Sequence, residues 1–380
     1  MDIMNYFEPV DPAAITTFGG KPDKYSLAGA ISVTSGNITG SNFHDLDIAI
    51  IGVPFHNGKF DDDQKSITER IRGYLYRLAL PYSQPAIADL GNLRPATTKR
   101  GSFLALRDII EFCNEMKVVT IVIGGSQDLT AGICEAFSND RFFTLSVADS
   151  LFDVKRGIEQ FSSENFLTGI FKKLPDLFQF NLIGFQNHLV GDTLIKRYGI
   201  SGAYLRLGQL RDDFLLAEPL LRDSDLLSLD MGVINYGSAP ATFQKNPNGL
   251  RGEEICQLSR LAGLSNKLKV FGLFGICPGE DTNGQTLKLA SEIIWYFIEG
   301  FGNRKGNGDR LTYKVEISGL EQPMIFLREP ETDRWWFEIC SLGGKKIEVA
   351  CSEKDYRKAK KNEIPGKWIK FMQKMDNLSK

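Results

Sequence analysis

Short apolar segments alternate with amphipathic helical patterns from about residue 47 to residue 300. The apolar segments have the length of strands buried on both faces, and several are rich in β-branched or aromatic residues. They lie at residues 47–55, 118–123, 142–147, 180–185, 226–229 and 270–276. The helical patterns lie at residues 103–116, 252–261 and 286–299, with Gly300 where the last helix would stop. This alternation predicts a mostly parallel sheet with helices on both faces, a three-layer α/β/α fold.

A polar, Gly- and Asn-rich stretch at residues 300–309 predicts a boundary near the end of this pattern. We expect residues 1–305 to form the α/β domain and residues 306–380 to form a small C-terminal appendage of short strands and a basic helix. The strand-like segments of the appendage lie at residues 312–317, 323–327 and 334–339, and its helix starts near Lys354. With 380 residues, of which 42% are hydrophobic, the chain is long enough to bury a large core.

Charge and composition exclude several classes of partner. The formal net charge is −2, which gives no electrostatic reason to expect nucleic acid or a membrane surface as partner. The first residues lack the basic and apolar regions of a signal peptide, and no apolar run is long enough to span a bilayer. The six cysteines include no Cys-x-x-Cys pair, so neither a zinc knuckle nor a redox pair is indicated. We therefore expect a cytoplasmic protein.

Aspartates follow two of the apolar segments. Asp149 and Asp153 come directly after the segment at residues 142–147, and Asp230 ends the segment that starts at Leu226. Because parallel strands deliver their carboxyl ends to one edge of the sheet, these side chains are candidates for a ligand or metal site. The alternative is that the aspartates lie apart at solvated loop tips.

Three motifs containing these residues resemble those of the ureohydrolase superfamily: arginase, agmatinase and formimidoylglutamase. The motifs are Gly-Gly-Ser-Gln-Asp at residues 124–128, Asp-Ser-Leu-Phe-Asp at 149–153 and Ser-Leu-Asp-Met-Gly at 228–232. Weaker matches at residues 51–55, at the Asp-Leu-Gly turn of residues 89–91 and at 248–250 occur in the family's order. The resemblance implies an arginase-like fold and hydrolysis of guanidino or formimino C–N bonds by a two-manganese cluster. It does not cover the appendage, and fold alone does not fix activity.

The resemblance also implies roles for the three aspartates. Asp149 and Asp230 match the aspartates that bridge the two ions, and Asp153 matches a ligand to one ion only. That ion would also be reached by the side-chain oxygen of Gln127, which stands where the family has a histidine.

The remaining ligand positions have changed. Leu151 stands at a second histidine's place and Gly232 at a carboxylate's place, so three of the six ligand positions are kept. Gly275 stands where the family carries the glutamate that binds the substrate's guanidinium or formimino group. We expect no cofactor, or one weakly bound Mn²⁺, Mg²⁺ or Ca²⁺, because hard cations prefer oxygen ligands. Without a cation, a Lys or Arg or a raised carboxyl pKa would have to offset the repulsion between converging carboxylates.

Two functions of different classes follow. The first, which we favour, is a ureohydrolase-like protein that has lost most of its two-manganese site and binds a small molecule or a protein partner without catalysis. The second is a mononuclear metal-dependent hydrolase of a linear amidine or amide, with Asp128, Glu253, Glu254 or His56 as substrate-binding or acid-base groups. A homo-oligomer is compatible with both. A nucleotide-binding protein is disfavoured, because no Gly-x-Gly-x-x-Gly or phosphate-binding Gly-Lys-Ser/Thr loop is present.

Overall fold

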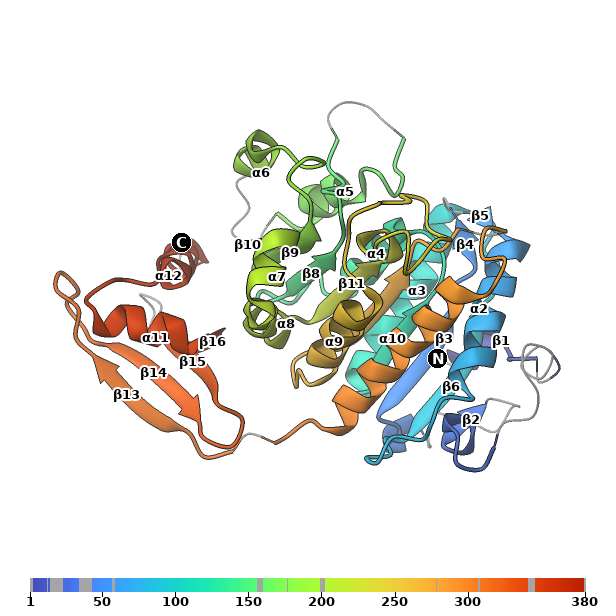
Figure 1. The fold of residues 1–380 in the computed structure, drawn as a ribbon, viewed down its shortest axis with the longest axis horizontal. Helices are drawn as coiled ribbons and strands as arrows, with labels where there is room; N and C mark the ends of the chain where they lie inside the picture. The colour runs from blue at the N-terminus through green and yellow to red at the C-terminus, as the bar shows by residue number, and fades with distance from the viewer. Residues whose placement is uncertain are drawn as a thin grey trace.

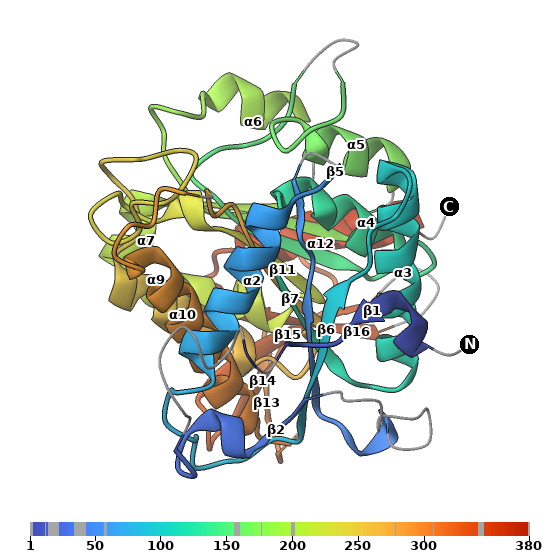
Figure 2. The same cartoon turned by 90° about the vertical axis from the view of Figure 1, so that its right-hand side faces the viewer.

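A ten-stranded sheet runs through the larger part of the molecule (Figures 1 and 2). The computed structural model describes residues 3–11, 13, 23–33, 43–56, 59–155, 160–175, 177–198, 202–277, 279–306, 308–340 and 346–378. The strand order is β1-β6-β3-β7-β12-β11-β8-β9-β10, with β2 also paired to β6. All pairs are parallel except that of β1 with β6.

The strands of this sheet are short and largely buried. Their bounds are β1 Phe7–Glu8, β2 Ile31–Val33, β3 Ile48–Gly52, β6 Ile87–Leu93, β7 Val119–Ile123, β8 Thr144–Ala148, β9 Gln179–Phe185, β10 Gly202–Arg206, β11 Leu226–Asp230 and β12 Val270–Phe274. A separate hairpin joins β4 Phe55–His56 to β5 Lys59–Phe60.

Helices cover both faces of the sheet because successive side chains of each buried strand point to opposite sides. In β3, Ile48 and Ile50 belong to one core, and Ala49 and Ile51 to the other. The first core is covered by α2 Asp62–Leu75, α7 Leu207–Asp212, α8 Glu218–Arg222, α9 Gly252–Gly263 and α10 Gln285–Gly302. The second is covered by α3 Lys99–Glu115, α4 Thr130–Glu135 and α5 Phe166–Lys173. The short helix α6 is Asp192–Tyr198. The three-layer fold expected from the sequence is therefore confirmed.

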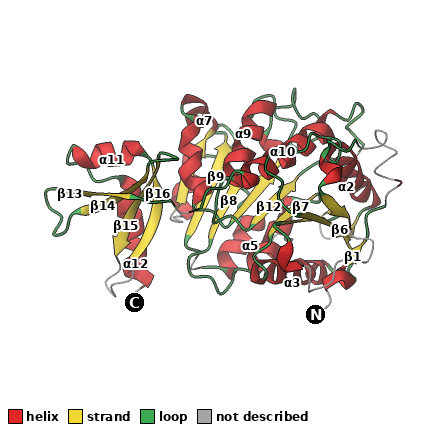
Figure 3. Ribbon diagram, turned by 90° about the horizontal axis from the view of Figure 1, so that it is seen from below, coloured by secondary structure: helices red, strands yellow, loops and turns green. Residues whose placement is uncertain are grey.

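A second, antiparallel sheet follows residue 308 and lies beside the first (Figure 3). Its strands are β13 Leu311–Val315, β14 Met324–Glu329, β15 Arg334–Cys340 and β16 Lys346–Cys351. The helices α11 Glu353–Lys360 and α12 Gly366–Leu378 follow. Both helices contribute to one core with Trp335 and Phe337, and Phe178, just before β9, completes it. The strand β16 was not predicted from the sequence.

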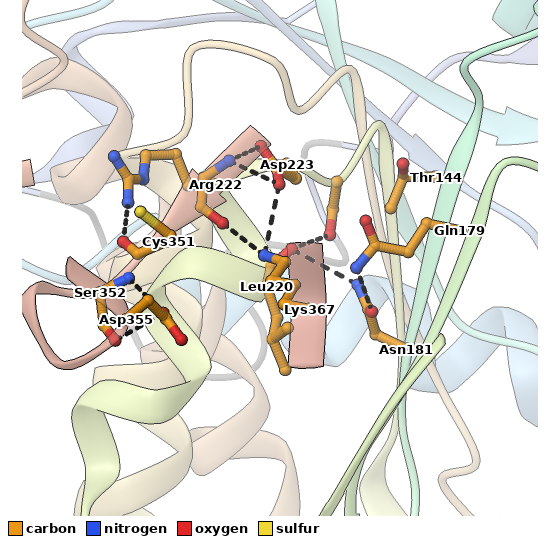
Figure 4. Close-up of polar contacts among 12 residues, drawn as sticks. Thr144, Gln179, Asn181, Leu220, Arg222, Asp223, Cys351, Ser352, Asp355 and Lys367 are labelled. Atoms are coloured by element: carbon orange, nitrogen blue, oxygen red, sulfur yellow. Dashed lines mark hydrogen bonds and ion pairs between the residues drawn. The ribbon is translucent and has the colours of Figure 1, made fainter. Parts of the chain in front are cut away.

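Polar contacts from the end of α8 hold the two sheets together (Figure 4). The Arg222 Nη2 group donates to the carbonyls of Trp335 and Cys351, each at 3.0 Å. The Asp223 carboxylate accepts from the Ala350 amide at 3.0 Å and lies 3.6 Å from the Lys367 ammonium. These contacts tie α8 to β15, β16 and α12.

Two local expectations were wrong. The Asp-Leu-Gly segment beginning at Asp89 is not a turn but lies within β6, where the pairing with β3 shifts register. Gly300 does not stop α10, which continues to Gly302. A Cβ at Gly300 would collide with the Arg260 carbonyl of α9, and one at Gly263 with the Phe297 carbonyl of α10. Each glycine therefore permits the close packing of the two helices, a tertiary requirement that the local pattern cannot reveal.

A buried ion pair fixes α2 to the sheet. Arg72 is fully buried, and its Nε and Nη2 groups donate to the two Asp89 oxygens at 2.7 and 3.0 Å. The Tyr76 hydroxyl donates to the same carboxylate at 2.7 Å, and the Arg72 Nη1 group donates to Asn92 at 2.7 Å. Since every charge is hydrogen-bonded, the network specifies the position of α2 relative to β6.

Replacing Arg72 with methionine would leave the Asp89 carboxylate buried without its cation. We expect Arg72→Met to lower the free energy of unfolding by about 3–5 kcal/mol in urea denaturation. The matched control, Arg107→Met, removes a partly exposed ion pair with Asp108 and should cost less than about 1 kcal/mol. Equal losses in the two variants would contradict this assignment.

Candidate functional site

The motifs singled out in the sequence meet at one edge of the sheet. Strands β7, β12, β11 and β8 are consecutive neighbours and parallel. Their carboxyl ends carry Gln127 after β7, Gly275 after β12, Asp230 at the end of β11, and Asp149 and Asp153 after β8. The parallel register thus brings residues that are far apart in sequence to a single edge.

The three aspartates interact with one another. The carboxyls of Asp149 and Asp153 share a hydrogen bond. The charge of Asp230 acts on Asp153, and the charge of Asp149 acts on Asp230. Asp149 is 3% exposed, whereas Asp153 and Asp230 are partly exposed, so solvent reaches the cluster. The alternative of isolated aspartates at loop tips is therefore wrong. Among the described residues, however, no group of three or more His, Cys, Asp and Glu is arranged to hold a metal ion.

Burial favours the protonated form of these carboxyls. Burial, followed by the charge of Asp153, raises the pKa of Asp149 well above its usual range. Burial and then the charge of Asp149 do the same to the pKa of Asp230. Burial raises the pKa of Asp153 to about 7, although the hydrogen bond from Asp149 opposes the increase. Two carboxyls that share a hydrogen bond at close range resist ionising together, so the pair keeps a proton at a higher pH than an isolated carboxyl would.

Two of the carboxyls fold back onto their own loops. Asp149 Oδ1 accepts from the Leu151 amide at 2.9 Å, and Asp230 Oδ1 accepts from the Gly232 amide at 2.7 Å. The loops themselves are joined by Asn246, whose buried Nδ2 group donates to Ser150 Oγ and to the Gly232 carbonyl, each at 2.9 Å. Asn246 was missed by the sequence analysis, because a lone asparagine in a long loop carries no local signal.

Gly275 lies against the carboxyl of Asp230. Its φ is +85°, and a Cβ built on it would lie 2.5 Å from Asp230 Oδ1. A Cβ at Gly232 would lie 2.8 Å from the same oxygen and 2.8 Å from Gln244 Cγ. Asp230 therefore uses space that side chains at residues 275 and 232 would need.

Gln127 lies next to this cluster with an unused acceptor. The residue is 1% exposed, and its Nε2 group donates to Ser228 Oγ at 3.2 Å. Ser228 is two residues before Asp230, and its hydroxyl also contacts Thr130 Oγ1 at 2.7 Å. Within the described residues no donor reaches the buried Gln127 Oε1. That oxygen could serve a cation.

The other candidate residues have structural partners or lie at the surface. Asp128 is buried, lies 2.6 Å from the Lys99 ammonium and accepts from Ser126 Oγ at 2.5 Å. Glu254 accepts from the Arg251 amide at 2.8 Å, at the start of α9, and Glu253 is exposed. His56 is half-buried and stacks on Phe243 with ring centroids 5.0 Å apart. Lys99, also missed, neutralises Asp128 from a helix remote in sequence.

Known proteins share this arrangement of strands. The chain is 22% identical over 316 residues to formimidoylglutamase from Citrobacter koseri, which covers 76% of this chain and 98% of that protein. Formiminoglutamase from Trypanosoma cruzi, solved with Mn²⁺, superposes with a TM-score of 0.62 at 18% identity and covers 70% of this chain and 97% of its own. Agmatine ureohydrolase from Thermoplasma volcanium superposes with a TM-score of 0.58 at 18% identity, and the match covers 73% of this chain and 94% of that protein. No family model matches the chain.

The chain therefore has the fold of the arginase/agmatinase superfamily. Its sequence is also similar to that of a formimidoylglutamase. The resemblance stated from the motifs is confirmed at this level. Among the described helices, none combines the length and apolar character needed to cross a membrane.

The cluster should make stability depend on pH in protein treated with EDTA. Each carboxyl has a higher pKa in the folded chain than in the unfolded chain. At a pH between the two pKa values, the folded state therefore binds more protons than the unfolded state. Stabilisation that is present at low pH is therefore lost as the pH rises through the folded pKa.

Asp153→Asn removes one of these carboxyls. The free energy of unfolding of the parent should fall as the pH rises from 5 to 8. We expect this fall, measured by urea denaturation, to be about 1–3 kcal/mol smaller in the variant. The exposed Asp212→Asn variant is the control. If both variants keep the parent's pH dependence, Asp153 does not titrate as described.

Proposed function

We propose that this protein binds a small molecule or a protein partner at the acidic strand edge and does not perform two-manganese amidine hydrolysis. The similar enzymes named above include a formiminoglutamase solved with Mn²⁺. In this chain the corresponding edge keeps three carboxyls but has changed on both the metal and the substrate side.

The observation that carries the proposal is the position of Asp230 relative to Gly275. The superfamily resemblance places a substrate-binding glutamate at residue 275. Here that residue has no side chain, and the place where one would begin lies within 2.5 Å of Asp230 Oδ1. A substrate cation would therefore lack the carboxylate that the superfamily resemblance implies, and losing a buried charge partner costs about 2–5 kcal/mol.

The donor set also fails to fit two manganese ions. A second ion would be left with the two bridging positions, Asp149 and Asp230, because Leu151 offers no donor and Gly232 no side chain. A single ion fits better, since Asp149, Asp153, Asp230 and the unused Gln127 Oε1 are all oxygen donors. A bound Mn²⁺, Mg²⁺ or Ca²⁺ ion would offset the negative charge of these carboxyls.

A second candidate function is mononuclear hydrolysis of a linear amidine or amide. It is favoured by the Asp149–Asp153 pair, in which one carboxyl holds a proton and the other has a pKa of about 7. Such a pair can accept and donate a proton near neutral pH. The partly exposed Asp153 is the member of the pair that a substrate could reach.

Metal content and turnover measured together separate the two functions. We expect protein purified from manganese-supplemented medium and dialysed to retain at most one metal ion per chain. It should not hydrolyse formiminoglutamate, arginine or agmatine, with Citrobacter koseri formimidoylglutamase as the positive control. Two ions per chain with turnover would refute the proposal, and one ion with turnover would establish the mononuclear hydrolase.

Restoring the ligands tests how far the site has diverged. We expect the triple variant Gln127→His, Leu151→His, Gly232→Asp to bind manganese more tightly than the parent, while each single change gains little, because the ligands share ions. Gly232→Asp alone should destabilise the protein, since its Cβ crowds Asp230 Oδ1. Gly232→Ala is the matched control for crowding without charge. Failure of the triple variant to gain metal affinity in titration calorimetry would show that the aspartates are not arranged as the resemblance implies.

A further inference from the structure

A large cavity lies between the helices α8 and α9 and the C-terminal sheet, and none of its lining residues belongs to the strand edge described above. Its volume is about 660 Å³. Its walls come from residues 213–222, the end of α9, the segment before β13 and the turn between β14 and β15. The start of α11 completes it. Both parts of the molecule therefore contribute to it.

Two arginines in the wall share one carboxylate. Arg222 Nε lies 3.1 Å and Arg334 Nε 3.2 Å from the same oxygen, Glu218 Oε1. All three side chains are less than one-fifth exposed. The three groups together carry one net positive charge, and burial lowers the pKa of Arg222. A second anion placed here would be stabilised in a region of reduced dielectric.

Two buried donors of the lining residues lack an acceptor in the described part of the chain. They are the Nη1 group of Arg222 and the indole Nε1 group of Trp335. Arg222 is 7% exposed and Trp335 is 4% exposed. Figure 4 shows Arg222 reaching the Cys351 carbonyl, a contact that leaves its Nη1 group unused. Buried donors without acceptors are costly, so each marks a place where an acceptor is missing.

The remaining wall contains much apolar surface. Leu215, Leu216, Pro219, Leu261 and Leu264 all line the cavity. The cation of Arg222 also stacks on Trp336, with its central carbon 4.2 Å from the ring centroid. A few polar groups beside apolar walls are typical of small-molecule sites.

We propose that this cavity binds a small organic carboxylate, with its oxygens at Arg222 and Arg334 and its apolar body against the leucines. The ligand would contact both parts of the molecule at once, so it would hold the C-terminal sheet against the ureohydrolase-like part. This site is independent of the proposed function of the strand edge.

Benzoate is a suitable probe because it joins a carboxylate to an apolar ring. We expect it to raise the melting temperature of the full chain with increasing concentration. It should also change the tryptophan fluorescence, since Trp335 lines the cavity and Trp336 stacks on Arg222. Inorganic phosphate should bind at least fivefold more weakly, because it lacks the apolar body. No response to benzoate, or equal binding of phosphate, would overturn the proposal.

Two variants should shift the affinity in opposite directions. Arg334→Gln removes a cation and should raise the Kd for benzoate at least fivefold, measured by calorimetry. Glu218→Gln removes the competing carboxylate with almost no change in shape and should lower the Kd at least threefold. Arg100→Gln, at an exposed ion pair elsewhere, should leave it unchanged. A shift of the benzoate Kd in the same direction in both cavity variants would contradict the proposed site. If Arg334→Gln fails to fold, the Kd of Glu218→Gln alone still tests the proposal.

Discussion

The parallel register of β7, β12, β11 and β8 is the constraint on which the candidate site depends. It places the ends of four strands side by side, so that Asp149, Asp153 and Asp230 interact although they are up to 81 residues apart in the sequence. The carboxyls are buried in part, and their own loops supply backbone amide donors and the Ser150 hydroxyl but no cation. Protonation or an added cation must therefore offset their repulsion. The chain has the superfamily fold, and we propose that the groups at its strand edge have changed.

Much of the fold could be predicted from the sequence because periodicity is a local signal. Buried strands such as β7 and β11 are continuous apolar runs, and helices such as α9 show one apolar face. Features set by tertiary contacts could not be predicted in this way. Gly300 has the composition of a helix stop, but it lies within α10, where the carbonyl of Arg260 approaches it.

The site shows the same division between local and tertiary information. Motif spacing located Asp149, Asp153, Asp230 and Gln127 at one edge, because spacing encodes where strands end. It could not show that Lys99 neutralises Asp128, that Asn246 joins two loops or that Asp230 fills the space beside Gly275. Those contacts depend on helices and loops that approach from elsewhere in the chain. The cavity between α8, α9 and the C-terminal sheet could also not be predicted from the sequence, since its walls belong to different elements.

The central claim is that the strand edge accommodates at most one metal ion. Anomalous diffraction at the manganese edge, from crystals soaked in MnCl₂, tests it directly. Our account expects a single peak or none among Asp149, Asp153, Asp230 and Gln127. Two peaks at this edge, about 3.5–4 Å apart as in two-metal hydrolases, would contradict it.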